Sequence, residues 1–295
     1  MPNINFLSSK HYTNATTTNY GDCVLIDING KLVIYDCGSI EHANEVIKYM
    51  KTNNYEKAIL ILSHQDADHF MGVPHLIENN KISHLYTLLL LKHKDKLLEL
   101  IGDNRKTRES VTKNITEIYN NIYSLSNNTN VILCDTLTSI NTLITPHVKI
   151  LGPDINYTLE AVAKALDSRE GDTINNETII NAVSTQVSVT FNNTKVLLCG
   201  DSCFDAIEEV IKDHNHIQLP HHGKEQQALK IWATNYGKND IIYYVSDNTG
   251  STIGGSDKIY KKPGYKMKNT RDGQILCSLL LSSSASIAGN LGGDE

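Results

Sequence analysis

Residues 58–72 read AILILSHQDADHFMG, an apolar run followed at once by two histidines and two aspartates within six positions. A short continuous apolar segment such as KAILIL, residues 57–62, is typical of a strand buried on both faces of its sheet. The polar cluster therefore begins where a buried strand is expected to end. Crowded carboxylates raise each other's proton affinity unless a cation compensates, and a divalent metal ion is the simplest such cation. We predict a metal site at this strand end, formed by His64, Asp66, Asp68 and His69.

Two other stretches place histidine or aspartate at the end of an expected strand. In CGDSC, Asp201 follows the strand expected over residues 194–199, and in LPHHG, His221 and His222 follow HIQLP. Imidazole nitrogen and carboxylate oxygen are both good ligands for Zn²⁺ and Mn²⁺. Enzymes built on sheets gather reactive side chains where strands stop, so these residues are candidates for the same site. The other histidines, taken singly, are interpreted as structural or surface residues.

The remaining sequence alternates between patterns typical of strands and of helices. The apolar runs of residues 22–28 and 31–37 are joined by Asn29 and Gly30, which predicts a β-hairpin. Helices are predicted over residues 41–54, 92–102, 107–125, 204–214 and 225–236, and further strands over 131–135, 147–153, 185–191 and 240–246. Residues 154–180 are polar and weakly patterned, which indicates an irregular surface excursion. Hairpins followed by alternating strands and helices indicate mixed sheets with helices outside, class α/β or α+β.

Composition and charge limit the classes of partner. The chain has 295 residues, of which 40% are hydrophobic and 20% charged, as in ordinary globular proteins. Its net charge of −6 argues against a surface that coats nucleic acid. A local basic groove remains open, because YKKPGYKMKNTR, residues 260–271, sets basic residues between aromatics. Lys261 and Lys262 are its candidate phosphate contacts, although the segment taken alone is better explained as a solvated loop.

The sequence has neither a secretory signal pattern at its start nor an apolar run of the roughly 18 residues needed to span a bilayer. We therefore expect a cytoplasmic protein with no membrane contact. The six cysteines show no C-x-x-C spacing, so neither a disulfide framework nor a zinc finger is indicated.

Taken together, these motifs resemble the metallo-β-lactamase-fold hydrolases. The signature of that family is a strand followed by His-x-His-x-Asp-His, and here the motif reads HQDADH, with Asp66 in place of the second histidine. This variant is most similar to the hydrolase domain of the bacterial competence DNA-uptake channel, the ComEC type. The smaller motifs that support the same subgroup are YGDCVLI (20–26), IYDCGS (34–39), NAVS (181–184), LPHHGK (219–224) and NTRDGQI (269–275).

The resemblance implies a four-layer αββα sandwich with mixed sheets and helices outside. We expect one such domain over residues 1–282, with a helical insertion at about 90–127, and a flexible tail over 283–295. The insertion is a candidate surface for a protein partner.

The resemblance also implies one or two Zn²⁺ or Mn²⁺ ions per chain. His64 and Asp66 would hold the first metal and Asp68 and His69 the second. Asp201 would bridge the two, with either His221 or His222 completing the second site. Where the family places a third histidine on the first metal, this chain has Asn181 and Ser184, which are weak ligands. The first site is thus expected to be richer in oxygen and more suited to Mn²⁺.

The roles implied for catalysis follow from the same assignment. Asp68 would orient a metal-activated hydroxide. Whichever of His221 and His222 is not a ligand could donate a hydrogen bond to the developing negative charge. Asp36, at the end of the strand over residues 31–37, is expected to hold a histidine ring in one tautomer.

These observations predict a metal-dependent hydrolase, specifically a phosphodiesterase or nuclease. The substrate would be a phosphodiester, for example a nucleotide or single-stranded nucleic acid. Hydrolysis of a small carboxylic ester, thioester or lactam is the alternative, and a non-catalytic scaffold is the second. Asp66 favours phosphodiester chemistry over lactam chemistry, and the retained ligands argue against a scaffold. The sequence leaves the oligomeric state open.

Overall fold

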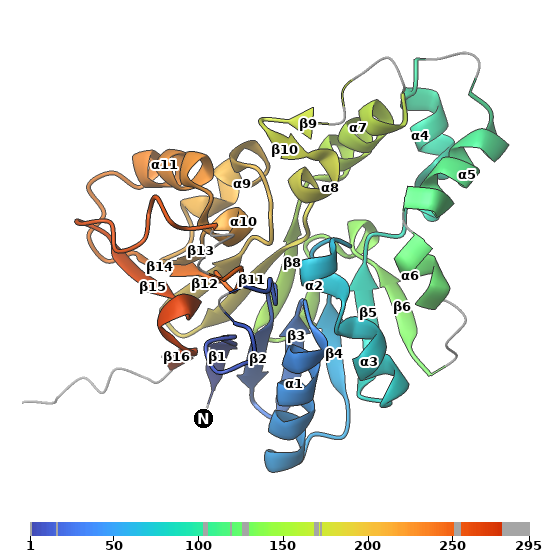
Figure 1. The fold of residues 1–295 in the computed structure, drawn as a ribbon. Helices are drawn as coiled ribbons and strands as arrows, with labels where there is room; N and C mark the ends of the chain where they lie inside the picture. The colour runs from blue at the N-terminus through green and yellow to red at the C-terminus, as the bar shows by residue number, and fades with distance from the viewer. Residues whose placement is uncertain are drawn as a thin grey trace, which may run out of the picture.

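Two seven-stranded sheets face each other, and helices cover their outer faces (Figure 1). The computed structural model describes residues 2–15, 17–102, 106–118, 120–125, 130–167, 171, 173–250 and 255–278. This arrangement is the four-layer αββα sandwich of the metallo-β-lactamase fold, as predicted.

The first sheet is built mainly from the N-terminal half of the chain. Its order is β16-β1-β2-β3-β4-β5-β6, antiparallel from β16 to β3 and parallel from β3 to β6. Its strands are β1 (Asn3–Phe6), β2 (Val24–Ile28), β3 (Lys31–Tyr35), β4 (Ala58–Ile61), β5 (Ile82–Thr87), β6 (Ile132–Asp135) and β16 (Ile275–Ser278). The hairpin predicted around Asn29 and Gly30 is confirmed as the β2–β3 pair, and β4 is a central strand as its apolar sequence indicated.

The second sheet comes from the C-terminal half. Its order is β15-β14-β13-β12-β11-β8-β7, parallel from β15 to β12 and antiparallel beyond. Its strands are β7 (Leu143–Thr145), β8 (Val148–Gly152), β11 (Gln186–Phe191), β12 (Thr194–Leu198), β13 (His216–Gln218), β14 (Ile242–Val245) and β15 (Lys266–Asn269). A two-stranded ribbon, β9 (Thr173–Ile174) and β10 (Glu177–Thr178), stands apart from both sheets.

Alternating side chains of one strand enter two different cores. In β2, Val24 and Ile26 lie in the core between the sheets, whereas Leu25 lies in the core between the first sheet and its helices. A period of two sends successive side chains to opposite faces, so a strand covered on both faces is apolar throughout. A third core, around Trp232, lies between the second sheet and its helices.

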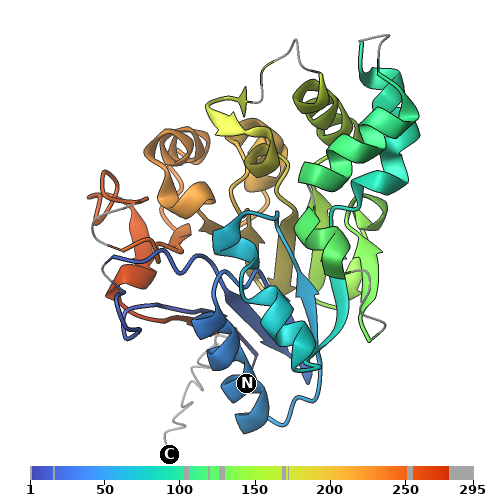
Figure 2. The same ribbon diagram turned by 45° about the vertical axis from the view of Figure 1, so that its right-hand side comes forward.

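Helices cover both outer faces. Figure 2 shows α1 (Ile40–Thr52) and α3 (Val73–Glu78) on the outer side of the first sheet. The Ser39 side chain accepts a hydrogen bond from the His42 backbone N–H and caps α1. On the second sheet, α9 (Phe204–Ile211) and α11 (Glu225–Thr234) contribute buried residues to the third core.

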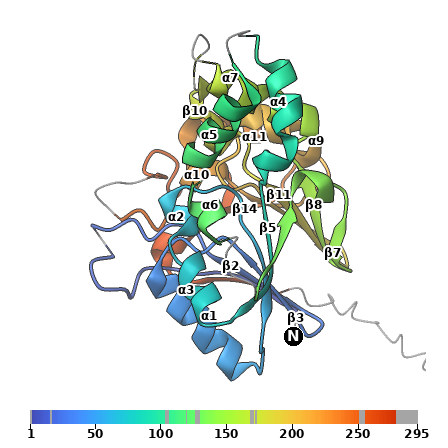
Figure 3. The same cartoon turned by 90° about the vertical axis from the view of Figure 1, so that its right-hand side faces the viewer.

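The helices predicted within residues 90–127 are present between β5 and β6. They are η1 (Leu90–His93), α4 (Lys94–Leu100), α5 (Arg108–Ile118) and α6 (Asn120–Leu125). Thr107 begins α5 as predicted, because its hydroxyl accepts the Ser110 backbone N–H at 3.2 Å. Contacts join α4 to α5 and to α7 (Ile155–Leu166), and Figures 1 and 3 show these three helices gathered at one end of the molecule.

The prediction of an irregular excursion over residues 154–180 is wrong. The segment contains α7 (Ile155–Leu166), the β9–β10 ribbon and the start of α8 (Ile179–Ala182). Asp154 caps α7, accepting the backbone N–H groups of Asn156 and Tyr157. Leu159, Val162, Ala163 and Leu166 follow the helical spacing and are buried. Val162 is β-branched and Ala163 is small, and polar residues lie between the members of the buried stripe, so the helical period is weak in the sequence.

Within the described ranges, no helix is long and apolar enough to cross a membrane. The tail predicted over residues 283–295 lies outside the described residues.

Candidate metal centre

The predicted ligands meet where strands of the two sheets end. The HQDADH segment follows β4, Asp201 follows β12, and His221 and His222 follow β13. The short helix α2 (Ala67–Phe70) begins inside the first motif, α10 (Pro220–Gly223) spans the histidine pair, and α8 lies near both (Figure 1). Chain segments about 150 residues apart in sequence thus supply one site.

A group of three buried side chains, here the His64 group, consists of His64, His69 and Asp201. One possible ligand atom from each lies within 4.8 Å of the others. His64 Nε2, His69 Nε2 and Asp201 Oδ1 are buried and lack a hydrogen-bond partner among the described residues. Leaving a buried polar atom unpaired is costly, and three such atoms at one point are what a metal ion would satisfy. The donor set therefore fits a divalent cation.

A second group, here the Asp68 group, consists of Asp68, His69 and His222 and shares His69 with the first. His222 Nε2 lies 3.0 Å from Asp68 Oδ2. On its other nitrogen, Nδ1, His222 lies 3.1 Å from Asp22 Oδ1 and 2.9 Å from the Ser246 carbonyl oxygen. Those acceptors hold a proton on Nδ1 and direct Nε2 at Asp68, where Nε2 donates a hydrogen bond to the carboxylate and, once deprotonated, could bind a metal ion.

The carboxylates of the centre attract positive charge. Burial alone would lower the pKa of His69, but Asp201 and Asp36 raise it well above its usual value. Burial likewise opposes protonation of His222, yet Asp22 and Asp201 raise its pKa well above the usual value. The pKa of Asp201 falls well below its usual value, because His69 and His222 outweigh the effect of burial. A bound cation would supply the charge that these protons supply in its absence.

Asp36 contacts the ring of His69, which is the geometry expected of a residue that holds a histidine in one tautomer. Its Oδ2 is 2.9 Å from His69 Nδ1, and its Oδ1 accepts the Ser63 backbone N–H at 2.6 Å. The contact leaves His69 Nε2 directed at Asp201 Oδ1, 3.2 Å away.

His221 faces the centre differently from His222. Its Nδ1 lies 2.6 Å from Glu177 Oε2, and its Nε2 lies 3.8 Å from Asp201 Oδ2. The His221 side chain is 31% exposed, whereas that of His222 is 6% exposed. The structure thus brings His222 into the Asp68 group and leaves His221 beside the centre, open to solvent.

Sequence reasoning missed the residues that hold the histidine pair and Asp68. Glu177 is buried and also contacts Lys224 Nζ at 2.9 Å; burial raises its pKa, but these partners outweigh burial and lower it. Asn19 Nδ2 donates to Asp68 Oδ2 at 2.8 Å. Asp22 stood in the YGDCVLI motif, which was a usable signal, whereas nothing near Glu177 or Asn19 in the sequence marks them.

The backbone at the histidine pair is unusual. His221 and His222 have φ values of 51° and 53°, in the left-handed region that residues with a Cβ rarely adopt. Gly200, just before Asp201, has φ 52°, and a Cβ there would lie 2.7 Å from Ser63 Cβ. The chain therefore turns sharply at the end of both β12 and β13, which points the next side chains back at the first sheet.

Three predicted residues lie beside the two groups. Asp66 Oδ2 is 3.7 Å from His64 Nε2, but its side chain is 41% exposed and belongs to neither group. Asn181 Nδ2 lies 3.4 Å from Asp201 Oδ2. Ser184 Oγ lies 3.3 Å from His64 Nδ1 and accepts the Asp201 backbone N–H at 3.2 Å. Asn181 and Ser184 thus contact residues of the His64 group.

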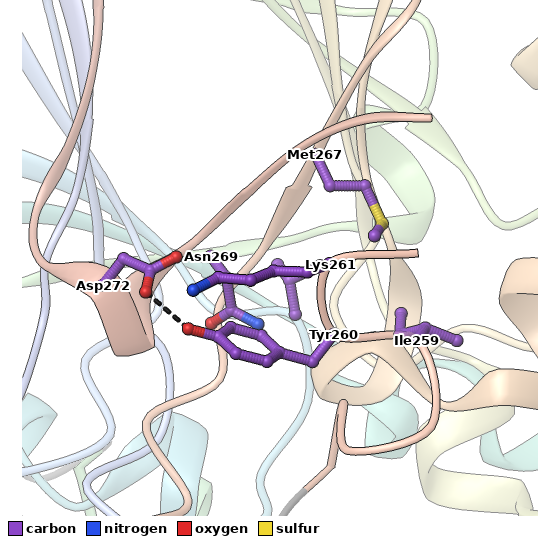
Figure 4. Close-up of a pocket in the computed structure, with 7 residues that line it drawn as sticks. Ile259, Tyr260, Lys261, Met267, Asn269 and Asp272 are labelled. Carbon is purple, nitrogen blue, oxygen red and sulfur yellow. Dashed lines mark hydrogen bonds between the residues drawn. The ribbon is translucent and has the colours of Figure 1, made fainter. Parts of the chain in front are cut away.

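The basic segment has its own contacts. Figure 4 shows Lys261 beside the Tyr260 ring, its ammonium 4.9 Å from the ring centroid, and the Tyr260 hydroxyl bonded to Asp272. The cavity that these residues line has a volume of only about 30 Å³. Arg271, at the end of the segment, is paired with Asp247 and Asp257. The segment is consequently less cationic than its sequence indicated, and substrate contacts by Lys261 and Lys262 stay a prediction.

Comparison with known proteins agrees with the fold. Residues 16–120 match the model of the metallo-β-lactamase superfamily. No curated protein sequence matches the chain significantly. Among solved structures, a diphosphatase of the PhnP family is 12% identical over 94% of this chain and 98% of that one, with a TM-score of 0.51. A metal-dependent hydrolase of the β-lactamase superfamily is 14% identical over 94% and 99%, with a TM-score of 0.54.

The metallo-β-lactamase fold protein YhfI from Bacillus subtilis is 12% identical over 83% of this chain and 85% of that one, with a TM-score of 0.50. At such identities, likeness of structure shows the fold. The chain therefore has the metallo-β-lactamase fold, residues 16–120 match the model of that superfamily, and two groups of side chains in it could hold metal ions.

Proposed function

We propose that this protein is a metal-dependent hydrolase that cleaves phosphodiesters. The observation that carries the proposal is the pair of ligand groups that share His69, each of which contains a carboxylate. Adjacent sites for two hard cations are typical of enzymes that displace an oxygen at phosphorus, including phosphatases and nucleases. The similar structure described as a diphosphatase supports phosphorus chemistry as well.

Two cations would be held as follows. Because the free nitrogen of His69 can bind only one ion, Asp66, 3.7 Å from His64, would replace it at the first site. His64, Asp66 and Asp201 would thus hold the first cation, and Asp68, His69 and His222 the second, with Asp201 between them. The bound metals would lower the pKa of a water molecule and neutralise charge on the phosphate oxygens. Because Asn181 and Ser184 stand where the family places a third histidine, the first site is rich in oxygen and suits Mn²⁺ as well as Zn²⁺.

Asp68 would orient the attacking water. It is held from two sides, by Asn19 at 2.8 Å and by His222 at 3.0 Å, so its free oxygen has a defined direction. Burial raises the pKa of Asp68, but the hydrogen bond from His222 and the charges of His69 and His222 outweigh it and lower that pKa. The carboxylate is ionised at neutral pH and can accept a hydrogen bond from the nucleophile.

His221 would act on the leaving side of the reaction. The ionised Glu177 accepts its Nδ1–H and fixes the orientation of the ring, so that Nε2, when it carries a proton, would donate to negative charge that develops on the substrate. The partial exposure of His221 lets it reach a bound substrate. Glu177 is the positioning residue for this donor.

The substrate class and setting follow the same reasoning. A net charge of −6 disfavours long duplexes, so a nucleotide, short single strand or other small phosphodiester is favoured. The HQDADH motif supports the ComEC-type subgroup within the superfamily. We also propose a single domain over residues 1–282 and a cytoplasmic location. The helices of residues 90–127 offer a surface for a protein partner.

Metal analysis combined with a substrate panel tests the proposal. Purified protein should contain Zn²⁺ or Mn²⁺ and hydrolyse bis(4-nitrophenyl) phosphate, and Asp68→Asn should lower this activity at least about a hundredfold. Asp213→Asn, an exposed carboxylate beyond α9, is the matched control and should leave it unchanged. Turnover of a lactam, lactone or thioester without any phosphodiesterase activity would favour carboxylic substrates. Absence of both metal and turnover would leave the scaffold interpretation.

A further inference from the structure

An apolar cavity of about 250 Å³ lies between α5, α7 and α8. For scale, an engineered apolar cavity of about 150 Å³ in another protein holds benzene. The cavity is lined by Ile118 of α5, Val162, Ala165 and Leu166 of α7, and Ile179 and Ile180 of α8. None of these side chains takes part in the ligand groups.

Two residues that line the cavity are linked to the metal centre. Gln65, between His64 and Asp66 in the sequence, donates its side-chain amide to the Ile118 carbonyl oxygen. In α8, Ile180 directly precedes Asn181, whose amide lies 3.4 Å from Asp201 Oδ2. A molecule with its phosphate at the centre could therefore extend into the cavity.

The edge of the cavity meets solvent. Ile118 is 40% exposed although its side chain is purely aliphatic. An apolar pocket open beside a few polar groups is the usual form of a site for a small organic ligand.

The lining favours an aliphatic occupant over a nucleobase. Among the described residues that line it, Thr178 has the only polar side chain, and its hydroxyl donates to Asn181 Oδ1 at 2.7 Å and accepts the Asn181 backbone N–H. The described lining residues also include no aromatic ring, so none of them offers a base a stacking partner. Its amide and amino groups would also lose their hydrogen bonds to water.

We propose that this cavity binds an aliphatic ester group of the substrate, so that the preferred substrates are alkyl phosphodiesters. The inference rests on the proposed phosphodiesterase function. Burying a methylene stabilises binding by about 0.8 kcal/mol, which corresponds to a factor of roughly four in affinity.

A series of 4-nitrophenyl phosphodiesters tests the proposal, because methyl, butyl and octyl esters share one leaving group. The kcat/KM should increase with chain length, mainly through a lower KM, by at most roughly fourfold for each methylene that becomes buried. The thymidine 5′-ester should be a poorer substrate than the octyl ester. Equal kcat/KM for all alkyl esters, or a preference for the thymidine ester, would overturn the proposal.

Two variants locate the effect. Ala165→Phe should fill the cavity and Ile118→Asn should make its edge polar, so both should lower the kcat/KM of the octyl ester toward that of the methyl ester. Ile132→Asn, on an isoleucine of β6 that is 58% exposed, is the control and should retain the chain-length dependence. Circular dichroism shows whether each variant folds. Retention of the full dependence in both cavity variants would place the alkyl chain elsewhere.

Calorimetry with octylphosphonate and methylphosphonate separates this proposal from the proposed function. Tighter binding of the octyl compound to the wild type, lost in Ala165→Phe, supports the cavity even if no phosphodiester is hydrolysed. Equal affinity for the two compounds overturns it, whatever the enzyme hydrolyses.

Discussion

The two sheets contribute to the metal centre in different ways. The first sheet supplies His64, Asp66, Asp68 and His69 within six consecutive residues after β4. The second sheet supplies Asp201 after β12 and the histidine pair after β13, each on a sharp backbone turn. One half of the site is thus formed by local chain geometry, and the other half by how distant segments pack.

The difference extends to the residues that hold the ligands. In the segment after β4, Asp66 directly precedes α2, and its backbone carbonyl accepts the N–H groups of His69 and Phe70. In the second half, His222 depends on Asp22, which lies 200 residues away in sequence. We therefore expect that substitutions in the part of the site contributed by the second sheet, and in its hydrogen-bond partners, will separate metal binding from turnover.

The largest effect is expected from Asp201→Asn, since Asp201 contacts histidines of both halves. Its carboxylate lies 3.2 Å from His69 and 3.8 Å from His221. Loss of its charge should remove bound metal and lower hydrolysis by more than about a hundredfold, which exceeds the usual effect of residues behind the ligands. Metal analysis and bis(4-nitrophenyl) phosphate turnover measure this. Full metal content in the variant would show that Asp201 does not join the halves.

The adjacent histidines provide the sharpest contrast. His222→Ala should lower the metal content, whereas His221→Ala should keep it and lower kcat by roughly a hundredfold, as expected for loss of a proton or hydrogen-bond donor. Metal titration of both variants, followed by kinetics at saturating metal, distinguishes the two roles. Similar metal loss in both would mean that His221 is a ligand too.

The carboxylates behind these histidines should have intermediate effects. Asp22→Asn should weaken metal binding by roughly 10- to 100-fold, because His222 loses its orienting partner. Glu177→Gln should lower kcat by a similar factor, with metal affinity unchanged. Metal affinity and kcat are measured for both Asp22→Asn and Glu177→Gln. An effect of Glu177→Gln on metal affinity alone would assign it to the ligand set.

A smaller effect, on stability, is expected from His42, a buried histidine in the N-terminal half of the chain that belongs to neither ligand group. Burial lowers its pKa to about 4, and it lies between Tyr12 and the Gly21 carbonyl. Because the unfolded chain binds this proton more readily, with a pKa of about 6.5, stability falls as pH decreases from 6.5 toward 4. At pH 5 this destabilisation should amount to about 2 kcal/mol.

Urea unfolding of chelator-treated protein at pH 7.5 and pH 5 measures this loss of stability. His42→Gln should lose less stability than the wild type over that interval. An equal loss in both proteins would mean that His42 is protonated in the folded state.

Much of the fold was predictable because the sequence signals were local. The β2–β3 hairpin follows from Asn29 and Gly30, and β4 from its unbroken apolar run. Helix α7 escaped prediction, since its buried stripe includes Ala163, which adds little to a hydrophobic period. In the basic segment, the pairing of Arg271 with Asp247 and Asp257 could not be predicted, because only the folded chain brings these residues together.

The sequence by itself indicated metal-ligand chemistry, because two histidines and two aspartates crowded after a buried strand call for compensating positive charge, which a metal ion can supply. It also determined the layered architecture, since apolar runs and helical periods demand burial on particular faces. Only the tertiary structure distinguished His222 from His221, because that choice depends on Asp22 and Glu177, carboxylates that come from opposite halves of the molecule. Neighbours in sequence share composition, but hydrogen-bond partners contributed by distant segments decide what each one does.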